Sequence, residues 1–181
     1  MAVKTIMSNY STTHVTVVGH SLGEDRRSHQ WCAFSDLALT GGAIALLDSV
    51  YLPLHLPNGT FLETVIYGLP RVSPPVSTSS LLTPISRTQV GNKAFADYID
   101  AKLPLAHITN KKDFIPIIPS LSAGYVHPSG EIHIDESGAW ELCPGQDNPS
   151  VLCAVGDVPS VLEGNALDSL GPYNGVSMGI C

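Results

Sequence analysis

Apolar residues occur along the chain in short runs with two different spacings. Val15–Val18 is a run of residues with high β propensity, and 61–67 (FLETVIY) is a second apolar run, which Gly68 and Pro70 bring to an end. Short runs of this kind, bounded by glycine or proline, predict β-strands. A further short strand is predicted over 105–109.

Between these runs the spacing changes to that of an amphipathic helix. In 42–52 the apolar residues recur every three or four positions, and Pro53 follows. The segment 91–104 predicts a second helix with Asn92 as its N-cap. Its inward face is predicted to consist of Ala94, Phe95, Tyr98 and Ile99. Because strands alternate with helices, we expect an α/β fold with a mostly parallel sheet.

Outside these segments the pattern is weaker. Residues 1–14 form a short polar start, and 124–134 (GYVHPSGEIHI) predicts a hairpin that turns at 128–130. The remainder of the chain is rich in loop-forming residues, with a short helix expected near 164–170.

The first strand leads directly into a motif with chemical meaning. Val15–Val18 is followed by Gly19-His20-Ser21-Leu22-Gly23, a G-x-S-x-G sequence. This motif after a strand is typical of a nucleophile elbow, a sharp turn that exposes a serine hydroxyl to a base. Ser21 is the candidate nucleophile, and the backbone N–H of Leu22 is the candidate oxyanion donor. A chance match to the motif is the alternative, which the preceding strand disfavours.

Length and charge narrow the class of protein. We expect 181 residues to form a single domain over 1–181, and 44% hydrophobic with 14% charged residues is a globular composition. The formal net charge of −7 argues against nucleic acid as a partner. No apolar run is long enough for a transmembrane segment, and the N-terminus as written has no signal-peptide core. The oligomeric state stays open.

Two of the four cysteines lie close together in the sequence. Cys143 and Cys153 flank a segment rich in Pro, Gly, Asn and Asp. This spacing favours a local disulfide of the kind that secreted proteins use, with two free thiols as the alternative.

Taken together and in this order, seven segments resemble the fungal class 3 lipases: VTVVGHSLG, GAIALLD, YGLPRV, GNKAFADYID, HITNKKDFIPIIP, GYVHPSGEIHI and CPGQDNPSVLC. The resemblance implies an extracellular α/β-hydrolase that acts on ester or lipid substrates, with triacylglycerol lipase and feruloyl esterase as alternative activities. It implies no metal and no organic cofactor. It also implies that Cys181 would pair with a cysteine that precedes the elbow in the family.

The resemblance implies a catalytic triad in the chain order serine, aspartate, histidine. Ser21 falls on the nucleophile, and Asp113 falls on the acid that orients the histidine. For Asp113 the alternative is a solvated loop carboxylate beside Lys111 and Lys112. At the histidine position the chain reads Asp168-Ser169-Leu170, so that Ser169 stands where the family has its base. A serine is not a general base near neutral pH, and a substitute among His20, His107, His127 and His133 is disfavoured because each suits a structural role.

The chain also departs from the family in its length. The resemblance implies that the part before the elbow, with several strands, the lid and one oxyanion donor, is missing, so we expect a partial α/β-hydrolase fold. Two segments, 24–41 and 72–89, interrupt the family pattern as irregular insertions of equal length. Their boundaries are compatible with introns translated in frame, and genuine surface insertions are the alternative. Cys32 lies in the first of them.

Two functions therefore remain in view from the sequence. The first is a serine carboxylic-ester hydrolase of triacylglycerol-lipase type, which works through an acyl-enzyme. The second is a non-catalytic homologue or fragment, which Ser169 at the base position favours.

Overall fold

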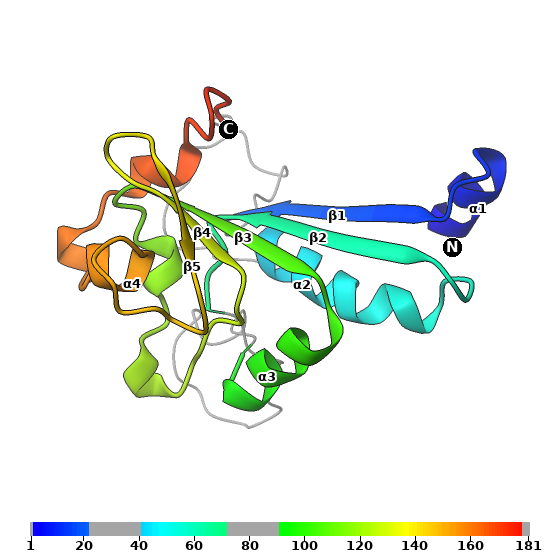
Figure 1. Ribbon diagram of the computed structural model, residues 1–181, viewed down its shortest axis with the longest axis horizontal. Coiled ribbons are helices and arrows are strands. Elements are labelled where there is room, and N and C mark those ends of the chain that lie inside the picture. Colours follow the sequence, from blue (N-terminus) through cyan, green and yellow to red (C-terminus); the bar gives the residue numbers. More distant parts are fainter. Residues whose placement is uncertain (1, 22–40, 72–90, 179–181) are drawn as a thin grey trace, which may run out of the picture.

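The computed structural model describes residues 2–21, 41–71 and 91–178. A five-stranded sheet runs through these residues in the order β1-β2-β3-β4-β5 (Figure 1). The strands are β1 (His14–His20), β2 (Phe61–Tyr67), β3 (Leu105–Asn110), β4 (Glu131–Ile134) and β5 (Trp140–Cys143). The pairs from β1 to β4 are parallel and β5 is antiparallel to β4. The prediction of an α/β fold with a mostly parallel sheet is confirmed.

The helices are α1 (Ala2–Asn9), α2 (Gly41–Tyr51), α3 (Lys93–Lys102) and the short α4 (Ala154–Asp157). α2 and α3 lie on the same side of the sheet (Figure 1). Both were predicted, because their apolar spacing and, for α3, the N-cap are local signals. The Asn92 side chain accepts the N–H of Phe95, as an N-cap should.

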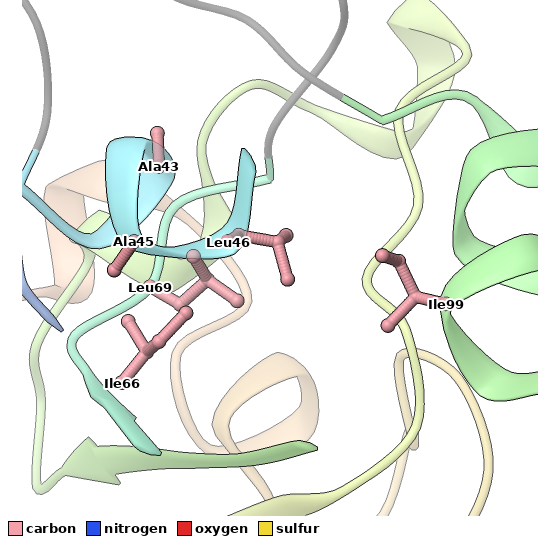
Figure 2. Close-up of a cluster of buried hydrophobic side chains, with 6 residues drawn as sticks. All are labelled: Ala43, Ala45, Leu46, Ile66, Leu69 and Ile99. Carbon is pink, nitrogen blue, oxygen red and sulfur yellow. The ribbon is translucent and has the colours of Figure 1, made fainter. Parts of the chain in front are cut away.

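The main core cluster lies between α2 and the sheet. Leu46 and Ala45 of α2 pack near Ile66 and Leu69, and Ile99 faces them from α3 (Figure 2). Gly19 permits this contact, because a Cβ there would lie 2.5 Å from the Cβ of Ala45 and 2.6 Å from the carbonyl oxygen of Gly41. The glycine before the elbow serine therefore lets α2 approach the end of β1.

The predicted inward face of α3 is only partly right. Ala96 and Ile99 are buried, but Ala94 and Tyr98 are exposed. α3 therefore contacts the core through a narrower set of residues than its apolar spacing suggested.

The predicted hairpin over 124–134 is wrong. Gly124 ends a short 3₁₀ turn, and β4 pairs with β3 in parallel. The true hairpin joins β4 to β5, and its turn is built by Asp135, whose carboxylate accepts the N–H groups of Ser137 and Ala139 at 2.8 and 3.0 Å. The sequence does not reveal this strand pair, because each strand is only four residues long and the segment between them, 135–139, is polar.

Other local expectations differ in detail. The polar start of the chain contains α1, which buries Met7. The helix expected near 164–170 is a 3₁₀ helix over Ala166–Leu170. No described helix is long and apolar enough to cross a membrane.

The predicted disulfide is confirmed. Cys143 at the end of β5 is bonded to Cys153, which precedes α4, with a Cα–Cα distance of 5.8 Å. Leu22, Cys32, Cys181 and nearly all of the two segments 24–41 and 72–89 lie outside the described residues, so the expectations about them remain predictions.

Candidate active site

Ser21 lies immediately after β1, at the edge of the sheet where the parallel strands end. Its N–H donates to the carbonyl of Tyr67 at 2.7 Å, and its own carbonyl accepts the N–H of Gly42 at 3.0 Å. The residue has a positive φ of 46°, which a non-glycine residue adopts rarely and at a cost. The strained backbone and the half-buried position agree with a serine on a nucleophile elbow.

Ser169 meets Ser21 at this edge. The two hydroxyl oxygens are 3.1 Å apart, within hydrogen-bond distance. Ser169 itself is buried, with 4% of its surface exposed. The backbone carbonyl of Ser169 accepts two hydrogen bonds. One comes from the ring N–H of His20 at 2.6 Å, and the other from the hydroxyl of Tyr173 at 3.2 Å. Two side chains thus fix the backbone of Ser169 and hold its hydroxyl beside the candidate nucleophile.

Asp113 lies in the loop that follows β3, and its side chain is buried, with 1% exposure. Its Oδ1 accepts the N–H of Ile115 at 2.9 Å, while Oδ2 has no hydrogen-bond partner among the described residues. This Oδ2, the Ser169 hydroxyl and the Tyr173 hydroxyl surround Gly68, where a Cβ would lie 3.1, 3.3 and 3.3 Å from them. The three polar groups therefore meet at one point beside the end of β2.

Burial raises the pKa of the Asp113 carboxyl to about 7. The Ile115 N–H and the nearby Ser169 hydroxyl oppose this shift by favouring the charged form, and the negative charge of Asp168 adds to it. The alternative of a solvated loop carboxylate beside Lys111 and Lys112 is wrong, because Asp113 is buried and Lys112 pairs with Asp157 instead, at 2.6 Å.

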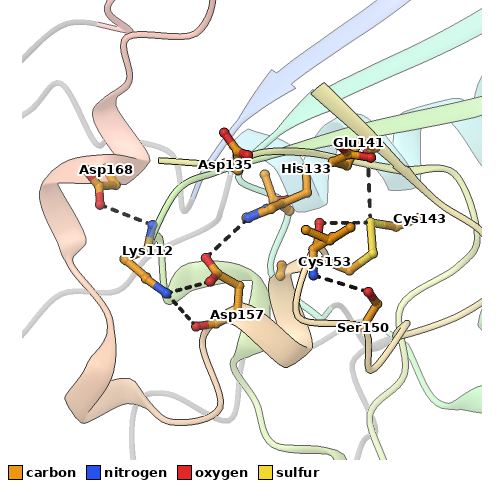
Figure 3. A network of polar contacts seen from close by, with 12 residues as sticks. Lys112, His133, Asp135, Glu141, Cys143, Ser150, Cys153, Asp157 and Asp168 are labelled. Atoms are coloured by element: carbon orange, nitrogen blue, oxygen red, sulfur yellow. Dashed lines mark hydrogen bonds and ion pairs between the residues drawn. A yellow bond between two sulfur atoms is a disulfide. The ribbon is translucent and has the colours of Figure 1, made fainter. Parts of the chain in front are cut away.

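The loop that carries Asp113 also holds the segment that carries Ser169. The side-chain amide of Asn110 donates to the carbonyl of Asp168 at 2.8 Å, and the N–H of Lys112 donates to the Asp168 carboxylate at 3.2 Å. A further bond runs from Asn165 N–H to the Lys112 carbonyl at 2.6 Å. Figure 3 shows Asp168 and Asp157 on either side of Lys112. One loop therefore positions two of the three candidate triad residues.

Several known proteins are similar to this chain. Two secreted mono- and diacylglycerol lipases of Malassezia globosa, MDL2 and MDL4, are 31% and 30% identical to it over 84% and 91% of its length. The crystal structure of a lipase from Rhizopus microsporus var. chinensis superposes with a TM-score of 0.66 and 26% identity over 97% of the chain. A triacylglycerol lipase with a serine protease triad as its catalytic centre superposes over 97% of the chain with a TM-score of 0.61 and 26% identity. No protein-family model matches the chain.

This chain belongs to the fungal class 3 lipase family. The structure has the α/β-hydrolase fold of these lipases. The chain spans 40% and 42% of the lengths of the two curated relatives, and 48% and 52% of the two solved structures.

The other histidines of this lipase homologue are occupied elsewhere. His107 and His127 stack with ring centroids 5.0 Å apart, and each donates a ring N–H to a backbone carbonyl, His107 to that of Pro128 and His127 to that of Pro116. Burial lowers the pKa of both to about 3. His133 contacts Thr109 at 2.7 Å and Asp157 at 3.4 Å. Among the described residues, no histidine nitrogen forms a hydrogen bond with the Ser21 hydroxyl.

Three contributors to the site were not assigned these roles from the sequence, although His20 was considered as a substitute base. His20 and Tyr173 hold the Ser169 carbonyl, and Gly68 leaves room for the polar groups around it. Proximity to the motifs was the available signal, since His20 precedes Ser21 and Tyr173 ends the stretch Asp168–Tyr173. The described residues contain one cluster with metal-ligand spacing, Glu131 with Cys143 and Cys153, and there the two sulfurs are bonded to each other.

Proposed function

We propose that this protein is a serine carboxylic-ester hydrolase of triacylglycerol-lipase type. The observation that carries the proposal is the arrangement of Ser21, Ser169 and Asp113 at the end of the parallel strands. Ser21 is strained and half-exposed, Ser169 lies 3.1 Å from it at the base position, and Asp113 is buried beyond. Family membership supports the same reaction, because the relatives are named as lipases.

In this reaction the Ser21 hydroxyl oxygen attacks the carbonyl carbon of an ester. The alcohol departs and leaves an acyl-enzyme, which water then hydrolyses. Leu22 is the proposed oxyanion donor, because the N–H after the nucleophile has this role in elbows of this type. Asp113 is the proposed acid of the triad, and Ser169 occupies the place of its base.

The relatives also suggest the substrate and the location. They are named secreted mono- and diacylglycerol lipases. We infer that the substrate of this protein is an acylglycerol or a related lipid ester, and that the protein acts outside the cell. Neither a metal nor an organic cofactor enters the proposed chemistry.

The experiment is hydrolysis of a short-chain p-nitrophenyl ester by the purified chain. Wild type should cleave the ester, and Ser21→Ala should reduce the rate to that of buffer. The matched control is Ser122→Ala, because Ser122 is exposed and its hydroxyl bonds, among the described residues, only with that of Ser120 at 2.8 Å. Equal rates for wild type and Ser21→Ala would contradict the proposed nucleophile.

The second candidate is a non-catalytic lipase homologue that binds lipid without cleaving it. The observation that favours it is the serine at position 169. Under this alternative wild type has no ester hydrolysis above buffer. Ser169→His supplies an imidazole beside Ser21 and should raise the rate by a factor on the order of 10²–10⁴, the usual contribution of a positioned general base.

A further inference from the structure

The candidate site contains a buried acid that lacks one hydrogen bond and a hydroxyl that can supply it. Asp113 Oδ2 has no hydrogen-bond partner among the described residues, and the Ser169 hydroxyl lies in the same place, since a Cβ on Gly68 would be 3.1 Å from Oδ2 and 3.3 Å from the Ser169 oxygen. The same Ser169 hydroxyl contacts Ser21 at 3.1 Å. A buried carboxylate oxygen without a donor is costly, so the position calls for a donor.

We propose that Ser169 is a proton relay between Ser21 and Asp113, and that the Asp113 carboxylate is the general base of the site. This inference rests on the proposed ester-hydrolase function. It differs from the family arrangement, in which a histidine accepts the proton. Here the serine passes the proton on and does not hold it.

The chemistry of a hydroxyl suits this role. A serine hydroxyl has one hydrogen to donate and two lone pairs that accept. Ser169 can therefore accept from Ser21 and donate to Asp113 Oδ2 at the same time. Its backbone is held by His20 and Tyr173, which bond to its carbonyl and leave the hydroxyl free to turn.

The environment makes Asp113 a base of suitable strength. Burial raises the pKa of its carboxyl to about 7, close to that of an ordinary histidine. Within the described part of the chain, the charged or titratable groups that face it are Asp168 and Tyr173. Asp168 raises the pKa of Asp113 further, whereas burial raises the pKa of Tyr173 and keeps its hydroxyl neutral. A general base is most effective when its pKa lies near the working pH.

The proton transfers balance without any further reactant. As the Ser21 oxygen bonds to the ester carbon, its proton moves to the Ser169 oxygen, and the Ser169 proton moves to Asp113 Oδ2. The transfers reverse when the alcohol leaves, so that the alkoxide oxygen receives a proton from Ser169 and Asp113 becomes charged again. Water then attacks the acyl-enzyme in the same way, and Ser21 recovers its proton.

His20 is the competing base, since its ring lies next to Ser169. Its ring nitrogen is, however, bonded to the Ser169 carbonyl at 2.6 Å, and burial lowers the pKa of the ring. We assign it a positioning role. His20→Asn should lower the rate but leave the pH dependence in place.

The test measures kcat/KM against pH for the full chain with a p-nitrophenyl ester. The wild-type profile should rise with pH through about 7. Ser169→Ala should lower kcat at least about 100-fold, and Ser169→Thr, which keeps the hydroxyl, should lose less than about tenfold. Asp113→Asn should remove the rise near neutral pH. A solvent-isotope proton inventory of wild type should show two protons in transfer, which a merely structural serine would not produce.

Four outcomes separate the relay from the proposed function. Loss of activity in Ser169→Ala with retention in Ser169→Thr supports the relay. Full activity in Ser169→Ala, or a pH rise that disappears in His20→Asn and persists in Asp113→Asn, overturns the relay and leaves the function standing. An inactive wild type with an active Ser169→His overturns both the relay and the proposed activity of this chain, and it favours the non-catalytic alternative. If neither wild type nor Ser169→His hydrolyses the ester, both proposals fail.

Discussion

At the scale of single residues, the unusual feature of the site is the serine at position 169, where the family has a histidine. Ser169 fills the position at which the resemblance implies a histidine, and it contacts the candidate nucleophile directly. Asp113 therefore has a hydroxyl beside it rather than a ring that can carry a positive charge. Burial raises the pKa of this carboxyl, and the negative charge of Asp168 raises it further.

The raised pKa of Asp113 predicts a pH-dependent change in stability. Between its ordinary value of 3.8 and about 7, the folded protein keeps a proton that the unfolded chain has lost. The contribution of Asp113 to the free energy of unfolding therefore falls as pH rises through this range and is constant above it. Asp113→Asn should be more stable than wild type at pH 8, by on the order of 4 kcal/mol at most, and the gain should vanish near pH 4.

Urea unfolding of both proteins at several pH values measures this difference. The other titrating groups contribute equally to both proteins and cancel in the comparison. A stability difference that does not change between pH 4 and pH 8 would show that Asp113 titrates normally. The same variant should lose activity at neutral pH. The Asp113 carboxyl therefore lowers the stability of the folded protein but is needed for its activity.

At the scale of elements, the site depends on how β1 joins α2. The carbonyl of Ser21 accepts the N–H of Gly42 at 3.0 Å, although 20 residues separate them in the sequence. If 24–41 were absent, Ser21 and Gly42 would become the first and fourth residues of a tight turn. The observed bond would then be the hydrogen bond that such a turn contains. The elbow is thus already arranged as it would be in a chain without this insertion.

This geometry predicts that deletion of 24–41 preserves the fold. The variant should have the circular dichroism spectrum expected for the described helices and strands. It should unfold at a temperature equal to or above that of wild type, because closing a shorter loop costs less entropy. Deletion of 72–89 is a matched control of the same length outside the elbow. Loss of cooperative unfolding only in the first variant would show that 24–41 is a structural part of the elbow.

The elements that sequence alone predicts are those with local signals. β1, β2, α2 and α3 have clear apolar spacing or a cap, and Ser21 lies in a recognisable motif. The β4–β5 hairpin was missed because its register depends on pairing with β3, which is distant in the sequence. The contact of Ser21 with Ser169 spans 148 residues and no local pattern specifies it, so it came only from resemblance.

At the scale of the whole molecule, a buried ion pair joins the elbow half to the loops of the second half. Arg71 is 2% exposed and contacts Asp147 through Nε and a terminal nitrogen, each at 2.8 Å. A second terminal nitrogen donates to the carbonyls of Ile117 and Pro119. Asp147 in turn accepts the N–H of His127 at 2.7 Å. The guanidinium therefore connects three loops around the disulfide-bearing region.

Arg71→Lys should destabilise the protein although it keeps the charge. A lysine cannot reproduce the planar set of donors, so some of the buried partners lose their bonds. We expect a loss of about 2–4 kcal/mol in the free energy of unfolding. Lys93→Ala is the contrasting control, because the Lys93–Asp97 pair is exposed to solvent and should contribute far less to the free energy of unfolding. Equal effects of the two substitutions in denaturant unfolding would contradict the importance of the buried pair.

The sheet also ends at β1 on one side of the described structure. Val18 and Phe61 are 62% and 53% exposed, on strands that pair with each other. Large exposed apolar residues on an edge strand and its neighbour are unusual for a complete hydrolase sheet. They agree with a chain that spans less than half of its curated relatives.

The most direct test of the central claim is covalent labelling of Ser21. The folded protein is treated with an alkyl phosphonate that reacts only with activated serine hydroxyls, and the intact mass and the labelled peptide are measured. We predict one phosphonyl group on Ser21 in wild type and none in Ser21→Ala or in heat-unfolded wild type. If the folded wild type stays unlabelled, or if Ser21→Ala is labelled equally, Ser21 is not an activated nucleophile.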